Sequence, residues 1–156
     1  MAGNIRAVMQ GGRVDRDEIV RCARAWIGTP YHHQASRLGI GADCLGLVRG
    51  VYRSVYGKDA EEPPPYTPDW GEAVGKETLL AAARRILCEG DLHDPRPGDV
   101  LVFRMFPDAL AKHTGIMTTD TMMVHAAEGT GVLEVPLVRW WRRRLVGVFG
   151  FPGIEV

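Results

Sequence analysis

The sequence predicts an α+β protein with an antiparallel sheet. Segments whose apolar residues recur at helical spacing come first, and short apolar runs typical of strands follow from Arg96 onward. Helices followed by a run of strands favour this fold class, since a regular alternation of the two would indicate a parallel sheet. The 156 residues contain no repeat and no low-complexity segment, so one hydrophobic core of ordinary size is expected.

The first helix is predicted from Asp15 to Ile27 and ends at Gly28-Thr29-Pro30. Its apolar residues recur every three or four positions, with arginines between them: Ile19, Val20, Ala23 and Trp26. A later helix is predicted from Lys76 to Cys88, with Gly90 capping its end. The proline-rich segment from Ala60 to Trp70 is predicted to be a stiff extended loop.

Between the first helix and this loop, another helix is predicted from Cys44 to Tyr56, stopped by Gly57. Gly46 and Gly50 are four residues apart and so lie on one face of it. Each glycine costs about 0.5–1 kcal/mol relative to alanine in a helix interior. We therefore expect another backbone to pack closely against that face, as suits a helix buried behind an active site.

Five strands are predicted after the Pro97-Gly98-Asp99 turn. All are short apolar runs: Val100–Phe103, His113–Thr118, Met122–Ala126, Val132–Val135 and Leu145–Phe149. Glu128-Gly129-Thr130-Gly131 supplies the turn between the third and the fourth.

The composition excludes several classes of protein. A formal net charge of zero argues against a nucleic-acid binder that relies on bulk electrostatics. Three cysteines without a CxxC pair suggest neither a disulfide framework nor a zinc knuckle. No window approaches the roughly 20 apolar residues of a membrane span, and the N-terminus lacks the apolar core of a signal peptide. We therefore expect synthesis in the cytoplasm, without an evident export signal.

The strongest candidate for chemistry is Cys44, at the point where a turn becomes a helix. A thiol in the first helical turn meets unpaired backbone N–H groups and the positive end of the helix dipole, which favours the nucleophilic thiolate. His113 and His125 lie on successive predicted strands, 12 residues apart, where antiparallel pairing can bring them side by side. A helix packed across the sheet would present Cys44 to His113, with His125 orienting the other ring nitrogen of His113.

These residues resemble the NlpC-type cell-wall peptidases, a bacterial branch of the papain-like fold. The resemblance covers most of the chain and lies in five motifs in family order: Gly28-Thr29-Pro30-Tyr31, Asp43-Cys44-Leu45-Gly46-Leu47-Val48, Pro97-Gly98-Asp99-Val100-Leu101-Val102-Phe103, Lys112-His113-Thr114-Gly115-Ile116 and Val124-His125-Ala126. It implies a single peptidase domain over 1–156, with N-terminal helices packed on a C-terminal antiparallel sheet. It also implies cleavage of the γ-D-glutamyl–diaminopimelate bond of peptidoglycan stem peptides, without metal or cofactor.

The resemblance also assigns roles. Cys44 is implied as nucleophile, His113 as base and His125 as the third polar residue. Tyr31 is implied near the oxyanion site beside the Cys44 backbone N–H, and Asp43 as a stem-peptide contact. From its position alone, Asp43 is equally interpretable as the N-cap of the helix.

The sequence departs from the family at Leu45, where a serine is usual, and at His32-His33-Gln34-Ala35-Ser36, where glycines are usual. The combination of Asp43-Cys44-Leu45-Gly46, no evident signal peptide and Glu128-Gly129-Thr130-Gly131-Val132 after His125 looks most like the phage-tail version of the family, which is similar to proteins of gene-transfer particles. This likeness implies phage-tail or gene-transfer-particle partners and delivery of the enzyme to the cell wall by the particle. Two alternatives remain: an amidase or acyltransferase on the same fold, or a structural adaptor of a tail tip.

The remaining chemically notable residues receive plainer interpretations. Cys22 and Cys88 are interpreted as small core residues. His32 and His33 are interpreted as rim residues of the cleft, with His32 a candidate substrate contact, and His93 as part of a solvated loop. The segment Trp140-Trp141-Arg142-Arg143-Arg144 is interpreted as a packed tryptophan with a solvated arginine face, or as a docking surface in a larger assembly.

Overall fold

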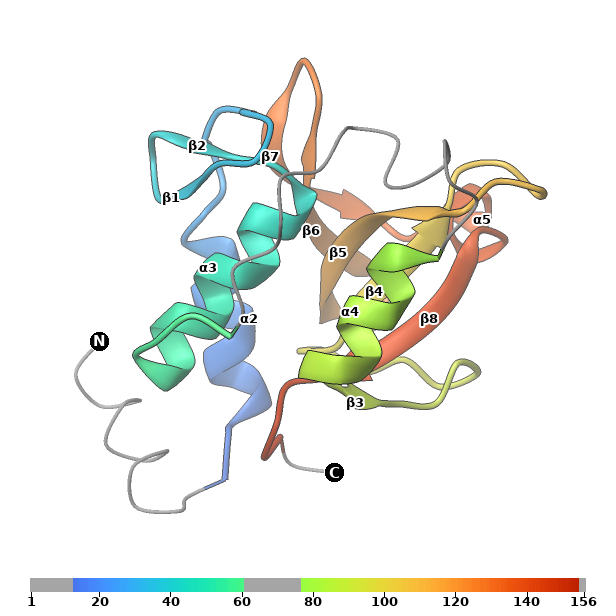
Figure 1. Ribbon diagram of the computed structural model, residues 1–156, viewed down its shortest axis with the longest axis horizontal. Coiled ribbons are helices and arrows are strands. Elements are labelled where there is room, and N and C mark those ends of the chain that lie inside the picture. Colours follow the sequence, from blue (N-terminus) through green and yellow to red (C-terminus); the bar gives the residue numbers. More distant parts are fainter. Residues whose placement is uncertain (1–12, 61–76, 155–156) are drawn as a thin grey trace.

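The computed structural model describes residues 13–60 and 77–154. Within them, three helices cover one face of a six-stranded antiparallel sheet, which confirms the predicted α+β class (Figure 1). The predicted proline-rich loop at Pro63–Pro68 and the predicted helix start at Lys76 lie outside the described residues. No helix among the described residues is both long and apolar enough to cross a membrane.

The sheet runs in the order β3-β8-β4-β5-β6-β7, and every neighbouring pair is antiparallel. Its strands are β3 (Cys88–Glu89), β4 (Val100–Arg104), β5 (Ala111–Thr119), β6 (Met122–Ala127), β7 (Gly131–Pro136) and β8 (Leu145–Gly150). All five predicted strands are confirmed, each within two residues at either end. Alternate side chains face opposite sides, so one strand contributes to two apolar clusters.

The larger cluster lies between the sheet and helices α2 (Arg16–Arg24), α3 (Cys44–Tyr56) and α4 (Thr78–Ile86). On the opposite face, Phe103 and Met117 pack with Leu137 and Trp141 from the connection between β7 and β8. That connection contains α5 (Arg139–Arg142), a short helix that the sequence did not predict. Both faces of the sheet are therefore covered.

Helix α3 has the predicted bounds because both of its ends carry local signals. The Asp43 carboxylate accepts a hydrogen bond from the Gly46 N–H, and Gly57 ends the helix in the left-handed conformation with φ 75°. Helix α2 begins where predicted, with Asp15 accepting from the Asp17 N–H, but it ends three residues before Ile27.

The predicted end of the third helix was wrong. Helix α4 stops at Ile86, and Cys88 and Glu89 form β3 against β8. The Gly90 N–H donates to the Val148 carbonyl, so Gly90 belongs to this pairing and not to a helix cap. Cys88 is consequently exposed at the sheet edge, contrary to its interpretation as a core residue, whereas Cys22 is partly buried against the main core.

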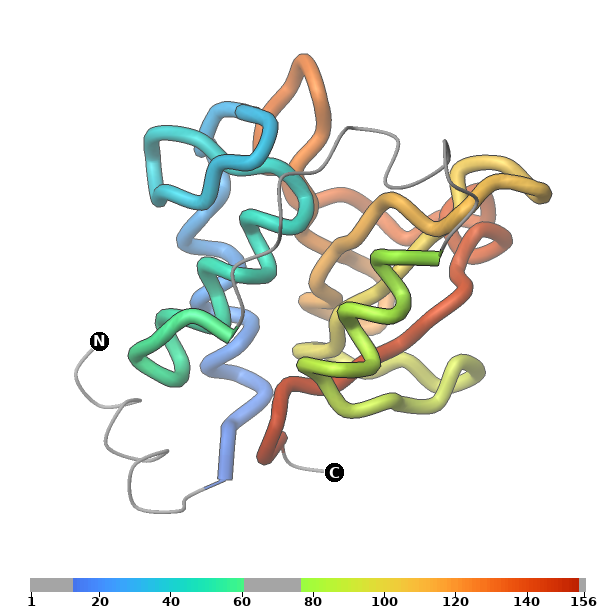
Figure 2. The backbone as a smooth tube through the Cα atoms, in the orientation of Figure 1, coloured from blue at the N-terminus to red at the C-terminus, as the bar shows by residue number. Residues whose placement is uncertain are grey.

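Two long-range contacts close the structure. The tube in Figure 2 shows the last described residues running back beside the start of α2, where the Val14 N–H donates to the Gly153 carbonyl at 2.8 Å. At the other end of α2, the Gly28 N–H donates to the Val132 carbonyl, and the Val132 N–H donates to the Thr29 carbonyl. Part of the edge strand β7 is thereby covered by the segment that leads to Tyr31.

Candidate active site

Cys44 is the first residue of α3 and is 8% exposed. Its thiol points to the Lys112 carbonyl oxygen, 3.8 Å from Sγ, at the start of β5. The Cys44 carbonyl accepts a hydrogen bond of 2.9 Å from the buried Thr114 hydroxyl. The residues on both sides of His113 therefore hold the nucleophile candidate against β5.

Burial, and then the neighbouring Asp43 carboxylate, raise the pKa of the Cys44 thiol to about 11. Hydrogen bonds from Thr114 and the Leu45 backbone lower this pKa without reversing the shift. The expectation that the helix N-terminus favours thiolate was therefore wrong. The dipole effect of about 0.3–1 kcal/mol is outweighed by desolvation of the charge.

His113 and His125 meet as predicted. His113 Nε2 lies 2.8 Å from His125 Nδ1, with the rings 5.1 Å apart between centroids and nearly perpendicular. The register Ile116↔Val124 places Gly115, rather than His113, opposite His125. A Cβ on Gly115 would stand 3.5 Å from the His125 Cβ, an ordinary contact, and 2.7 Å from the sulfur of the flexible Met123 side chain.

Both imidazoles are neutral near pH 7. Burial, and then the neighbouring His125, lower the pKa of His113 to about 3, and burial lowers the pKa of His125. If Cys44 acts as a nucleophile from this state, its thiol proton moves to the imidazole as the sulfur attacks. Since Nε2 of His113 is engaged with His125, Nδ1 is the nitrogen available for that proton.

Tyr31 lies beside the thiol and forms a parallel bridge with Ala42. Burial, and then the neighbouring Cys44, Asp43 and Glu128, raise the pKa of Tyr31 to about 12. Its hydroxyl therefore keeps its proton and can donate to an oxyanion. The small hairpin of β1 (Ser36–Arg37) and β2 (Gly41–Ala42), which the sequence did not predict, leads from this segment to Cys44.

Asp43 is 2% exposed and is the N-cap of α3. One carboxylate oxygen accepts from the Gly46 N–H at 2.7 Å, and the other accepts from the Gln34 N–H at 2.7 Å. The second bond fixes a loop in which Gln34 has the unusual φ of 63°. Of the two interpretations of Asp43, capping is confirmed, and contact with a stem peptide stays a prediction.

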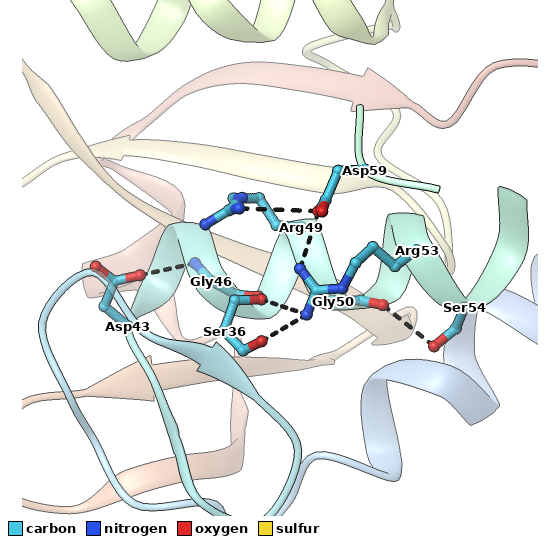
Figure 3. Close-up of polar contacts among 8 residues, drawn as sticks. All are labelled: Ser36, Asp43, Gly46, Arg49, Gly50, Arg53, Ser54 and Asp59. Carbon is cyan, nitrogen blue, oxygen red and sulfur yellow. Dashed lines mark hydrogen bonds and ion pairs between the residues drawn. The ribbon is translucent and has the colours of Figure 1, made fainter. Parts of the chain in front are cut away.

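A polar network behind the site ties the same loop to α3 (Figure 3). The Ser36 hydroxyl donates to the Gly46 carbonyl at 2.6 Å and accepts from Arg53 at 2.8 Å. Arg53 also donates to Asp59 at 3.0 Å, and Arg49 lies 3.8 Å from the same carboxylate. A Cβ on Gly46 would stand 1.8 Å from the Ala35 carbonyl oxygen, so the expected close approach of another backbone is confirmed there. At Gly50 the neighbour is instead the Trp26 side chain.

Cys44, His113 and His125 line one cleft of about 390 Å³. Tyr31, His33, Asp43 and Glu128 also line it, together with residues to which the sequence gave no site role: Met105, Lys112, Ala126, Ala127, Trp140 and Trp141. His33, with Nδ1 3.9 Å from Asp43, lies at this cleft. His32 does not line it, because its side chain lies over Gly41, where a Cβ would be 2.9 Å away. The geometry favours His33 over His32 as the rim residue.

A helix-borne cysteine, a histidine pair on adjoining strands and an α+β core define the class of papain-like cysteine peptidases. The sequence model of the NlpC/P60 family matches residues 28–149, and the chain belongs to this family. The matched range contains all three residues of the predicted catalytic set.

Curated relatives and solved structures agree with this membership. The chain is 25% identical over 129 residues to the probable endopeptidase NlpC of Escherichia coli K12, covering 79% of the chain and 73% of that protein. It is 24% identical to murein DD-endopeptidase MepS/murein LD-carboxypeptidase of the same strain, covering 76% of the chain but only 54% of MepS. The chain thus spans about half the length of MepS.

Two crystal structures show the same fold. The NlpC/p60 domain of the peptidoglycan hydrolase SagA superimposes with a TM-score of 0.61 at 23% identity, covering 88% of this chain and 100% of that one. An NlpC/P60 family protein from Bacillus cereus ATCC 10987 superimposes with a TM-score of 0.65 at 17% identity, covering 92% of this chain and 41% of that one.

Proposed function

We propose that the protein hydrolyses a peptidoglycan stem peptide, at the γ-D-glutamyl–diaminopimelate bond, with Cys44 as nucleophile, His113 as base and His125 as orienting residue. The observation that carries this proposal is the convergence of the three side chains on one cleft in an NlpC/P60 chain. The hydrogen bond of 2.8 Å between the imidazoles supports the division of roles.

In the proposed reaction, His113 Nδ1 takes the thiol proton while Cys44 Sγ attacks the scissile carbonyl carbon. The tetrahedral oxyanion is stabilised by the Cys44 backbone N–H, in the first helical turn, and by the Tyr31 hydroxyl. One donor of this kind contributes about 3–4 kcal/mol to the stability of the transition state. His113 then protonates the leaving amine, and a water that gives its proton to His113 releases the acyl group from sulfur.

The walls of the cleft suit a charged peptide. Lys112 and Glu128 place opposite charges among its lining residues, which could pair with a carboxylate and an ammonium group of the stem. His33 adds a third polar group at the rim, whereas Asp43 already accepts two backbone hydrogen bonds. The name of the relative MepS refers to other murein bonds, those of a DD-endopeptidase and an LD-carboxypeptidase. The identity of the cleaved bond is therefore the most specific part of the proposal.

We also propose delivery by a phage-like particle, with a tail or gene-transfer-particle protein as partner. The support is the Asp-Cys-Leu-Gly segment at Cys44 and the Glu-Gly-Thr-Gly turn at Glu128. In purified particles, Cys44→Ala should leave assembly intact while DNA delivery falls. Lost assembly would favour the structural adaptor instead.

The first test is digestion of diaminopimelate-type peptidoglycan by wild-type protein and by Cys44→Ala, with the products identified by mass spectrometry. Fragments ending at γ-D-glutamate, made by the wild type alone, are expected. Equal digestion by Cys44→Ala would overturn the assignment of the nucleophile. An acyl-transfer product without a new diaminopimelate amine would favour an amidase or acyltransferase.

A further inference from the structure

Helix α5 lies on the connection between β7 and β8, two strands that are not neighbours. β7 is one edge of the sheet, whereas β8 lies between β3 and β4, so the chain must cross β6, β5 and β4. It crosses the face opposite the main helices, where Leu137 and Trp141 join the second apolar cluster with Met117. His113 shares this face because it lies four positions before Met117 on β5, and side chains an even number of positions apart on a strand point to the same side.

Trp141 contacts both imidazoles of the site. Its indole stacks on His113 with 5.4 Å between centroids and 25° between planes. It meets the His125 ring nearly at right angles, at 5.2 Å. The fully buried Phe103 lies 4.9 Å from the indole and supports it from the sheet.

The arginines around Trp141 hold α5 in place and are not merely solvated, as the sequence suggested. Arg142 donates to the Leu137 carbonyl at 2.9 Å and to the Asp120 carbonyl at 3.0 Å. Arg144 donates to the Met105 carbonyl at 3.2 Å, and its guanidinium lies 3.8 Å from the centroid of Trp140. Because α5 is fixed at both ends, the indole is held against the histidines in a defined orientation.

We infer that Trp141 is a positioning residue of this site, which holds the His113 and His125 rings in their hydrogen-bonded orientation and excludes water from the bond between them. The role rests on the proposed function, since it concerns the same three catalytic residues. An indole offers a large, rigid surface that packs on the faces of the two imidazole rings and does not compete for the hydrogen bond between their nitrogens. A hydrogen bond shielded from water is stronger and better directed than one open to it.

Charged and titratable groups approach the pair from every wall of the cleft: Tyr31, His33, Asp43, Cys44, Lys112 and Glu128, with Arg144 behind Trp140. Trp141 carries no charge. Replacing Trp141 therefore changes the hydration and orientation of the His113–His125 pair and leaves these charges in place.

The test compares Trp141→Ala, Trp141→Phe and, as a matched control at the N-cap of the same helix, Val138→Ala, whose exposed side chain does not line the cleft. NMR titration of the histidine imidazoles in the free protein is combined with the pH dependence of kcat/KM. In Trp141→Ala, both imidazole midpoints should rise by at least one pH unit, and kcat should fall ten-fold or more. Trp141→Phe should restore most of the wild-type midpoints and most of the wild-type kcat, and Val138→Ala should leave both midpoints as in the wild type.

Unchanged midpoints in folded Trp141→Ala would overturn the inference, as would equal behaviour of the alanine and phenylalanine variants. If Trp141→Ala does not fold, Trp141→Leu keeps much of the apolar volume and should show the same rise; no rise would overturn the inference. The titration needs no substrate. If the imidazole midpoints rise but the protein cleaves no peptidoglycan, only the proposed substrate is contradicted. If the midpoints do not rise but the protein still cleaves peptidoglycan, only the role of Trp141 is contradicted.

Discussion

The Thr114 hydroxyl donates to the Cys44 carbonyl at 2.9 Å and so ties the first turn of α3 to β5, one residue from His113. Thr114 is 2% exposed, and no water can replace its hydrogen bond without a rearrangement. The contact links the proposed nucleophile directly to the strand that carries the proposed base.

Thr114→Val removes the hydroxyl while keeping the shape of the side chain, so it should leave the Cys44 carbonyl without this donor. We expect a loss of about 1–3 kcal/mol in the free energy of unfolding and a fall in kcat that exceeds any rise in KM. Thr118→Val is the matched control. Thr118 is also buried on β5, but its hydroxyl donates to Glu134, away from the cleft. Denaturant titration and steady-state kinetics check both, and equal losses of kcat would contradict the prediction.

Gly46→Ala should disturb the site through its backbone. The added Cβ would stand 1.8 Å from the Ala35 carbonyl oxygen, so the loop that Asp43 holds must move away from α3. We expect destabilisation of more than about 2 kcal/mol, despite the better helix propensity of alanine, together with lower kcat/KM.

Ser54→Ala on the same helix is the control for Gly46→Ala. It removes only a hydrogen bond of 3.1 Å to the Gly50 carbonyl, and we expect a change within about 0.5 kcal/mol by thermal or denaturant unfolding. A Gly46→Ala variant as stable and active as Ser54→Ala would contradict the prediction, because the loop would then move away from α3 without loss of stability.

Sequence reasoning succeeded where the determining signal was local. The bounds of α3 follow from Asp43 and Gly57, each of which acts within one turn. The pairing of His113 with His125 follows from strand periodicity and from the short turn between β5 and β6. The end of α4 could not be predicted, because Cys88 is drawn out of the helix by pairing with Gly150 on β8, far along the chain.

The parts of the site that sequence reasoning missed depend on the crossover between β7 and β8. Helix α5 has four residues, too few for a periodic pattern, and its position over His113 depends on the strand order. The pair Trp140-Trp141 was the available signal, but composition alone could not place it in the cleft. The pKa of Cys44 was missed for a related reason. The helix N-terminus can be recognised in the sequence, whereas the burial of Cys44, which outweighs its effect on the pKa, depends on the tertiary structure.

The raised pKa of Cys44 predicts slow alkylation at neutral pH. With a pKa of about 11, roughly one molecule in ten thousand carries the thiolate at pH 7. The rate of reaction with iodoacetamide should therefore rise with pH through the alkaline range. The measurement uses the Cys22→Ser, Cys88→Ser background, since Cys88 is exposed and would otherwise react first. A rate that is already constant between pH 5 and pH 7 would indicate a thiolate–imidazolium pair and contradict the prediction.

The lowered pKa of His113 predicts that the protein loses stability in acid before its carboxylates titrate. Unfolded, the imidazole titrates near 6.5; folded, it titrates near 3, because burial disfavours the cation. Between these values the unfolded chain binds more protons, so the free energy of unfolding falls as pH falls, by at most about 1.4 kcal/mol per pH unit for this group. The contribution is fully present above pH 6.5, and His125, whose pKa is also lowered, adds to it.

Denaturant titrations at intervals from pH 7.5 to pH 4 measure this slope. His113→Gln should reduce it, since glutamine can still hydrogen-bond to His125 but gains no proton in the unfolded chain. His93→Gln replaces an exposed loop histidine and should leave the slope as in the wild type. An unchanged slope in His113→Gln would mean that His113 is not held neutral by burial. The proton transfer proposed from Cys44 would then have to be replaced by attack from a preformed ion pair.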